Sequence, residues 1–150
     1  MLPPARLSPL LLLLLVSPLL AGAGWPDLRA SAKKLGGGDK DVSVVVGVEA
    51  YAHLVGVPGA GSTAGMWHDY LSESIGVPQR TAALVRDVDA NAAGLRAELD
   101  RAVSKATEGS TLWLVLVGQG STSDDGELLV QLFRTKPEQR GSAKANLSIS

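Results

Sequence analysis

Three short apolar segments, separated by two segments with helical spacing, limit most strongly how this chain can fold. The apolar segments are DVSVVVGV at 41–48, TAALVRDVD at 81–89 and TLWLVLVG at 111–118. Each is rich in β-branched or aliphatic residues and ends near a glycine or aspartate, which is typical of buried strands. The alternation of strands with helices predicts an α/β fold, with an open, mainly parallel sheet and flanking helices. Because 111–118 is apolar at nearly every position, we expect it to be a central strand covered on both faces.

The segment between the first two strands contains a glycine-rich loop and then a helix. Within 64–76, five apolar residues fall at helical spacing: Met66, Trp67, Tyr70, Leu71 and Ile75. Thr63 is expected to cap the start of this helix, because its hydroxyl can accept a hydrogen bond from the first turn. Gly76 is expected to end the helix, and Pro78 prevents its continuation.

A second helix is expected over 92–109, with Asp89 or Asn91 as its N-cap. Three residues form its apolar stripe: Leu95, Leu99 and Val103. On the opposite, solvated face, Arg96 and Asp100 are spaced to form an ion pair one helical turn apart.

The first 23 residues have the three-part layout of a secretory signal peptide. A single basic residue, Arg6, precedes an apolar run over 10–20, and Ala21 and Ala23 form an A-x-A cleavage site. The run is far shorter than the roughly 20 residues that span a bilayer. We therefore expect cleavage after Ala23, a protein that is secreted or periplasmic, and no membrane contact after cleavage.

The remaining chain divides into a linker, one domain and a tail. Residues 24–40 mix proline, glycine and charge without a period, which is typical of a linker. One α/β domain is expected over 41–133, in which 127–133 is a candidate for a short fourth strand. Residues 134–150 contain few apolar residues and are predicted to be a disordered tail.

The charge balance and the cysteine count limit partners and chemistry. The chain has 14 basic and 15 acidic residues, and removal of the segment that contains Arg6 leaves 13 and 15, a net charge of −2. Such a balance favours neither nucleic acid nor an anionic membrane as a partner. The chain has no cysteine, so it contains neither a disulfide nor a thiol nucleophile.

The glycine-rich loop fits phosphate-binding motifs only in part. Residues 56–63 have the glycine spacing of a P-loop, but Ser62 stands where a lysine must reach the phosphates. The same loop approximates a dinucleotide fingerprint, although its first glycine does not follow the strand immediately. In that alternative, the binding residues are Gly59, Gly61 and Asp87 or Asp89.

No metal site is expected. His53 and His68 are the only histidines; His68 is expected to be a surface or boundary residue of a helix, and His53 has no cluster of Asp, His or Glu near it in the sequence. The turn at 124–126, Asp-Asp-Gly, is interpreted as ordinary turn chemistry rather than as a cation site. Residues 146–148, Asn-Leu-Ser, fit a glycosylation sequon, which matters only in a eukaryotic secretory route.

Taken in order, these segments resemble the caspase-like cysteine peptidases, in particular the bacterial caspase and metacaspase type. The family's first strand ends in an I/V-G-x-x-x-Y pattern, matched at Val46, Gly47 and Tyr51. The family's P-G-A-x-N-D-A-x-x-W-like phrase is matched at Pro58, Gly59, Ala60, Ala64 and Trp67. The glycines around its catalytic histidine, and the acidic turn after it, are matched at Gly118, Gly120, Asp125 and Gly126. The resemblance covers roughly residues 41–130.

The resemblance implies the fold of a cysteine-type endopeptidase whose chemistry is missing from this chain. In the family a histidine supports a cysteine nucleophile, and Gln119 stands at the position of that histidine. A primary amide is neither an acid nor a base near neutral pH. We therefore expect no catalytic residues and no cofactor, and an inactive pseudoenzyme that acts in peptide binding or in assembly with a protein partner.

The family's cysteine belongs on a further parallel strand, which this chain does not contain. We therefore expect an exposed sheet edge at the third or fourth strand, through which the protein associates. Two alternatives stay open. One is the dinucleotide-binding, Rossmann-like protein described above, and the other is a non-functional product of a truncated peptidase gene.

Overall fold

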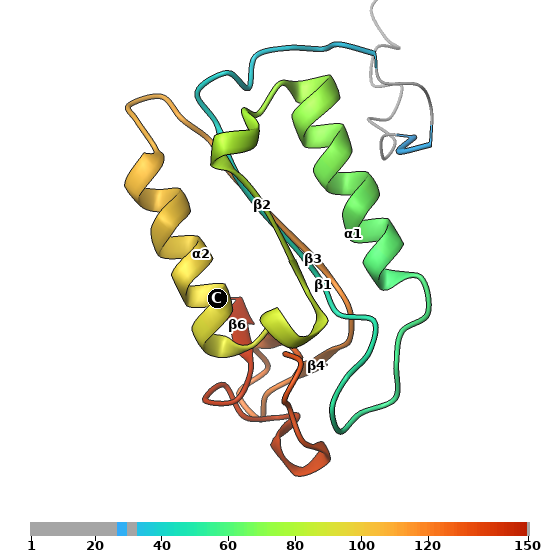
Figure 1. Cartoon of the computed structure of the whole chain (residues 1–150). Helices are drawn as coiled ribbons and strands as arrows, with labels where there is room; N and C mark the ends of the chain where they lie inside the picture. The colour runs from blue at the N-terminus through green and yellow to red at the C-terminus, as the bar shows by residue number, and fades with distance from the viewer. Residues whose placement is uncertain (1–26, 30–32, 150) are drawn as a thin grey trace, which may run out of the picture.

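The computed structural model describes residues 27–29 and 33–149, and it has the predicted α/β fold (Figure 1). The predicted signal peptide, 1–23, lies outside the described residues. The main sheet contains β1 (Val42–Gly47), β2 (Ala82–Arg86) and β3 (Leu112–Val117), all parallel and in the order β2-β1-β3. The three predicted apolar segments therefore form the three strands of one parallel sheet.

β1 is the central strand, and the expectation that 111–118 would be central is wrong. All six residues of β1 are buried, whereas β3 is at an edge and exposes 43% of Leu112 and 40% of Leu114. The order follows from the two crossovers. α1 (Ala60–Asp69) and α2 (Ala92–Lys105) cover opposite faces of the sheet. A right-handed crossover through α1 places β2 on one side of β1. A right-handed crossover through α2, on the other face, leads back past β1, so β3 lies on the opposite side of β1.

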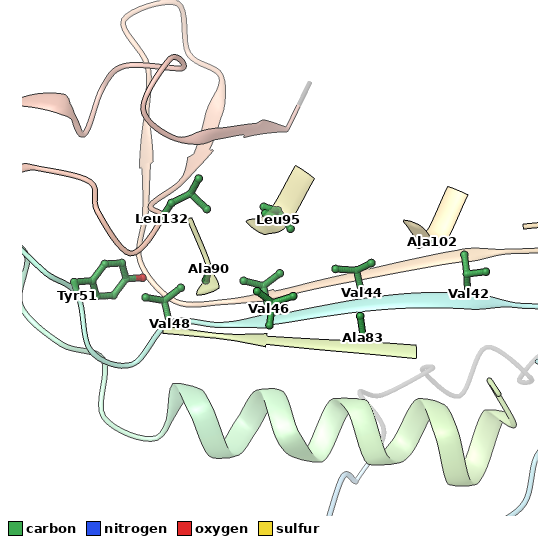
Figure 2. Packing of buried hydrophobic residues seen from close by; sticks show 11 residues of the cluster. Val42, Val44, Val46, Val48, Tyr51, Ala83, Ala90, Leu95, Ala102 and Leu132 are labelled. Atoms are coloured by element: carbon green, nitrogen blue, oxygen red, sulfur yellow. The ribbon is translucent and has the colours of Figure 1, made fainter. Parts of the chain in front are cut away.

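Alternate residues of β1 form two hydrophobic cores, one on each face of the sheet. On one face, Val42, Val44 and Val46 pack with Leu95 and Ala102 of α2 (Figure 2). On the other face, Val45 packs with residues of α1 and the segment after it. Since side chains alternate along a strand, Leu112, Leu114 and Leu116 lie on the α2 face of β3.

Asp41 fixes the position of β3 against β1. Its buried carboxylate accepts a hydrogen bond from the Thr111 N–H (2.9 Å) through one oxygen and from the Trp113 indole N–H (2.8 Å) through the other. In the resulting register, Val42 is paired with Leu112.

The first helix begins earlier than the sequence predicts. α1 starts at Ala60, and Gly59, in the left-handed conformation (φ 86°), is its N-cap. Thr63 is not the cap, because its N–H already donates to the Gly59 carbonyl within the first turn (2.9 Å). The helix continues as a π-helix, η1 (Tyr70–Ile75), and ends at Gly76 as predicted.

The second helix has the predicted N-cap, Asn91, whose side chain accepts a hydrogen bond from the Gly94 N–H (3.1 Å). The predicted Arg96–Asp100 pair forms at 3.7 Å on the exposed face. Before this helix, the chain turns through two short 3-10 helices, η2 (Gln79–Thr81) and η3 (Asp87–Asp89), so β2 is shorter than the predicted 81–89.

A small antiparallel sheet follows the parallel one, with the order β4-β5-β6. Its strands are β4 (Gly120–Thr122), β5 (Leu128–Val130) and β6 (Leu147–Ile149). The candidate fourth strand at 127–133 therefore forms β5 in this second sheet and does not extend the parallel sheet.

Residues 134–149 differ from the predicted disordered tail. They contain η4 (Pro137–Gln139) and β6, and hydrogen bonds between buried polar groups hold them. The Thr135 hydroxyl donates to the Asn146 side-chain oxygen (2.7 Å), and the Asn146 amide donates to the carbonyls of Gln139 and Ser142 (2.8 Å each). Low hydrophobicity does not predict this order, because buried polar hydrogen bonds and the packing of a single residue, Leu147, against the core hold the segment.

The end of the predicted linker also belongs to the domain. The N–H groups of Leu35 and Gly36 donate to the Ser74 carbonyl (2.7 and 3.0 Å), and that of Gly38 donates to the Ile75 carbonyl (3.0 Å). In the described ranges, the helices are all too short or too polar to cross a bilayer.

Candidate functional site at the carboxyl edge of the sheet

The carboxyl ends of the three parallel strands gather the residues that the sequence singles out. Ligands of open parallel sheets bind at this edge, where the loops after the strands meet. Hydrogen bonds join the loop after β1 to Asp87 after β2 and to Gln119 after β3. The structure therefore brings together Tyr51, Asp87 and Gln119.

Gln119 uses all four of its polar groups within the chain. Its backbone N–H donates to the Tyr51 phenol oxygen (2.7 Å), and its carbonyl accepts from the Gln131 N–H (2.9 Å). Its side-chain amide donates to the Val55 carbonyl and accepts from the Arg140 guanidinium (3.2 Å). Gln119 thus connects the loop after β1 to the chain around β5 and η4, which is a structural role.

The glycine before Gln119 makes room for Tyr51. A Cβ atom at position 118 would lie 2.5 Å from the Tyr51 phenol oxygen, which is far inside contact distance. Burial of Tyr51 raises the pKa of its phenol, and Asp87 raises it further, while the Gln119 N–H and Arg140 lower it. The net pKa is raised, so the phenol stays protonated at neutral pH. The Gly-Gln-Gly sequence therefore permits a close contact with a neutral, buried phenol.

Asp87 joins the ends of β1 and β2. One of its carboxylate oxygens accepts hydrogen bonds from the N–H groups of Glu49 and Ala50 (2.9 Å each). Asp87 has φ 41°, and no other residue besides glycine has a positive φ in the part of the chain that the structure describes. A positive φ is unfavourable for a residue with a side chain, and these two hydrogen bonds help to hold it.

Glu49 occupies the start of α1. The N-cap, Gly59, has no side chain to offer, and Glu49 supplies the missing acceptor by accepting a hydrogen bond from the Gly61 N–H (3.0 Å). A pyrophosphate would have to bind at this helix start and would meet the Glu49 carboxylate there. Asp87 is bound to the loop after β1, and Asp89 is exposed in η3. This geometry disfavours the dinucleotide alternative.

The two histidines lie on different elements, one in a loop and one in a helix. His53 is exposed in the loop before α1, and His68 is near the other end of α1, where its ring is 3.3 Å from the Asp69 carboxylate. In the described ranges, no three histidine or acidic side chains group as metal ligands would. Asp124 and Asp125 are exposed at the tip of the β4–β5 hairpin.

The predicted sequon is part of the hydrogen-bonded structure. Asn146 is buried (8% exposed), and its side-chain nitrogen donates to three carbonyls, those of Gln139, Arg140 and Ser142. Glycosylation would attach a sugar to that nitrogen. The folded chain therefore does not offer Asn146 to a glycosyltransferase.

Two residues of the carboxyl edge escape the sequence analysis. Glu49 comes soon after β1, separated from it by Val48, and its place at the carboxyl end of a strand is a signal that could have found it. Arg140 lies in the segment predicted as a tail, and no pattern in the sequence points to its contact with Gln119. No pattern in the sequence points to a surface cavity of about 600 Å³ beside the start of α2 either; Arg134 and Lys144 are among the residues that line it.

The outer edge of β3 is a second candidate surface. The Thr111 carbonyl accepts a hydrogen bond from the Val42 N–H of β1 (3.0 Å), and the Val117 carbonyl accepts one from the Val48 N–H just after β1 (2.9 Å). Because backbone groups alternate in direction along a strand, the N–H and C=O groups of Leu112, Leu114 and Leu116 point away from β1. We call these groups the outer edge of β3, and no strand pairs with it within residues 27–29 and 33–149.

Comparisons with known protein families, with curated proteins and with solved structures find no match to this chain.

Proposed function

We propose that this chain is a caspase-like domain without peptidase activity that acts in protein assembly, by accepting a β-strand from a protein partner along the outer edge of β3. One observation carries the proposal: this edge is apolar and uncharged, and its hydrogen-bonding groups are unpaired in the described chain. The proposal includes export through the signal peptide at 1–23. It needs no cofactor and no nucleic acid.

The absence of peptidase activity follows from the chemistry of Gln119. An amide does not exchange a proton near neutral pH, so it cannot activate a nucleophile. Both polar atoms of its side chain also have partners in the chain, Val55 and Arg140. The nearest buried titratable group, Tyr51, has a raised pKa and is bound to the Gln119 N–H, which makes it a poor general base.

The outer edge of β3 has the properties of a strand acceptor. An edge strand with free N–H and C=O groups is a template for another strand, and proteins that avoid such pairing place charges or prolines there. Residues 110–123 contain neither. The edge of β2 differs, because the cavity above it is rimmed by Asp89, Glu98 and Arg101. The asymmetry favours β3 as the strand that accepts a partner.

A peptidase assay tests the first half of the proposal. The purified chain and its Gln119→His variant are incubated with peptides that have Arg, Lys or Asp before the scissile bond. We expect no turnover from either protein. Turnover that survives purification and is lost in Gln119→Ala would contradict the proposal.

Amide hydrogen exchange tests the second half, with a control inside the same strand. The N–H groups of Trp113, Val115 and Val117 point toward β1 and exchange slowly in any case. The N–H groups of the outer edge are measured with and without a short peptide of alternating valine and lysine, and with the same peptide methylated at alternate amides. The proposal is supported if the N–H groups of the outer edge exchange slowly, either in the chain without peptide or after the unmethylated peptide is added. Fast exchange under all conditions contradicts it.

A further inference from the structure

We propose that the strand that pairs with the outer edge of β3 comes from a second copy of this chain. The two β3 strands run antiparallel across a twofold axis, and the two main sheets become one continuous sheet. This inference rests on the proposed function, since it names the partner of the same edge.

The outward groups of β3 select one register. When Leu114 faces Leu114 of the second copy, Leu112 faces Leu116 of that copy, and all outward N–H and C=O groups find partners. Each facing pair then exchanges two hydrogen bonds, which gives about six across the axis. Any shifted register leaves some of these groups unpaired. The twofold axis therefore passes beside Leu114.

The same arrangement covers the exposed leucines. Leu112 and Leu114 lie on the α2 face of the sheet, where they are 43% and 40% exposed because α2 packs over β1 and β2. A twofold axis perpendicular to the sheet keeps the α2 faces of both copies on one side. The leucines of the two copies then meet in the gap between the two α2 helices and remove one another from water.

Charges at the two ends of β3 are complementary in an antiparallel pair. Glu108 is exposed in the turn before β3. Arg140 is exposed beyond the other end, where its guanidinium contacts Gln119. Antiparallel pairing brings the start of each strand beside the end of the other, so Glu108 of each copy approaches Arg140 of its mate. The strands between these ends carry no charge that would oppose the contact.

Symmetry explains why β3 pairs with β3 rather than with β2. Pairing β3 of one copy with β2 of the next is a head-to-tail contact, which leaves free edges and continues without limit. It would also set the uncharged β3 beside the charged rim over β2. In a twofold pair, the outer edges of both β3 strands are paired with each other, so no third copy can add at this edge. A six-residue strand buries less than the roughly 800 Å² per partner of a standard interface, so we expect a dissociation constant on the order of micromolar.

Sedimentation of paired variants tests the inference. In Leu114→Lys, two lysines face each other at the axis, and we expect the dimer to weaken about 100-fold. Leu128→Lys is the matched control, because Leu128 is 51% exposed but lies on β5. Thermal unfolding checks that both variants fold. If Leu114→Lys does not fold, Leu112→Lys at the end of the strand replaces it.

Single cysteines test the register, because the natural chain has none. In Leu114→Cys the Cα atoms of the two cysteines are about 5.5 Å apart, so a short bifunctional thiol reagent can join the two thiols. In Leu112→Cys the two Cα atoms are offset by four residues along the strands and lie roughly 14 Å apart. We expect efficient cross-linking of the first variant and at least tenfold less of the second, although the two leucines are equally exposed.

The outcomes separate the inference from the proposed function. A dimer that Leu114→Lys disrupts and Leu128→Lys preserves, with preferential cross-linking at position 114, supports both. A dimer that Leu114→Lys leaves intact, or open-ended aggregates, overturns the inference. A monomer whose outer edge binds the strand peptide also overturns it and leaves strand acceptance standing. A monomer whose outer edge binds no strand overturns both.

Discussion

Replacing Gly118 by alanine should destabilise the fold through Tyr51. The added Cβ would lie 2.5 Å from the Tyr51 phenol oxygen, and its next neighbours, the carbonyl and Cβ of Val48, are at 3.5 and 3.6 Å. Tyr51 is 9% exposed and has little room to move. The backbone of Gly118 is not left-handed, so alanine meets no conformational penalty there. The effect therefore isolates the contact with the phenol.

Two terms contribute to the expected loss of stability. Overpacking of a buried contact costs about 1–3 kcal/mol. Movement of Tyr51 also breaks the hydrogen bond from the Gln119 N–H (2.7 Å), which costs about 1–2 kcal/mol for a part-buried donor. We expect Gly118→Ala to lower the free energy of unfolding by about 2–5 kcal/mol. Tyr51→Phe alone should cost about 1–2 kcal/mol, because it removes only the acceptor.

A double-mutant cycle measured by urea unfolding checks this reasoning. In the Tyr51→Phe background the clashing oxygen is absent, so Gly118→Ala should cost at least about 1 kcal/mol less than in the natural chain. Gly141→Ala is the control, because its Cβ would meet only the Thr122 carbonyl at 3.9 Å. The reasoning is refuted if Gly118→Ala costs no more than the control, or if its cost is the same with Phe at position 51.

Three further predictions concern groups near these contacts. Because the pKa of Tyr51 is raised in the folded chain, the stability difference between the natural chain and Tyr51→Phe should be constant below pH 10 and shrink as the pH rises above 10. Urea unfolding across pH 8–11 measures this difference, and a difference that grows with pH would contradict the prediction. Glu49→Ala removes the acceptor of the Gly61 N–H and should cost about 1 kcal/mol, while Glu73→Ala, on an exposed residue, should cost less than about 0.5 kcal/mol. In the folded chain Asn146 should stay unmodified when the purified protein is incubated with a eukaryotic enzyme that attaches N-linked sugars, and a mass increase removed by an amidase for N-linked sugars would disprove this.

The strand and helix segments of the main sheet were predictable, but the position of one strand was not. β1 and β3 are both apolar on both faces, and an apolar run does not tell which strand lies in the middle. The handedness of the two crossovers decides it: with α1 and α2 on opposite faces, the chain returns past β1 before it adds β3. The same pattern analysis placed the cap of α1 at Thr63, because the actual acceptor, Glu49, is distant in sequence.

The candidate site was predictable where motif spacing reflects close packing. Gly118 and Tyr51 match the resemblance to the caspase-like peptidases, and the structure gives a physical reason for both residue types in their mutual contact. Arg140 and Asn146 were not predictable, because polar hydrogen bonds within a segment of low hydrophobicity leave no periodic pattern in the sequence. Their hydrogen bonds order residues that composition alone assigns to a tail.

The buried carboxylate of Asp41 fixes the register on the inner side of β3, which faces β1, and the outer side has no such group. Two apolar strands can slide past each other by two residues without exchanging their faces, so hydrophobicity alone permits several alignments. On the inner side, each such slip would strip Asp41 of the Thr111 and Trp113 donors and leave a buried charge without partners. On the outer side no polar residue penalises a slip. The alignment of a strand that binds there depends on how many outward backbone groups it pairs and on contacts beyond the ends of β3.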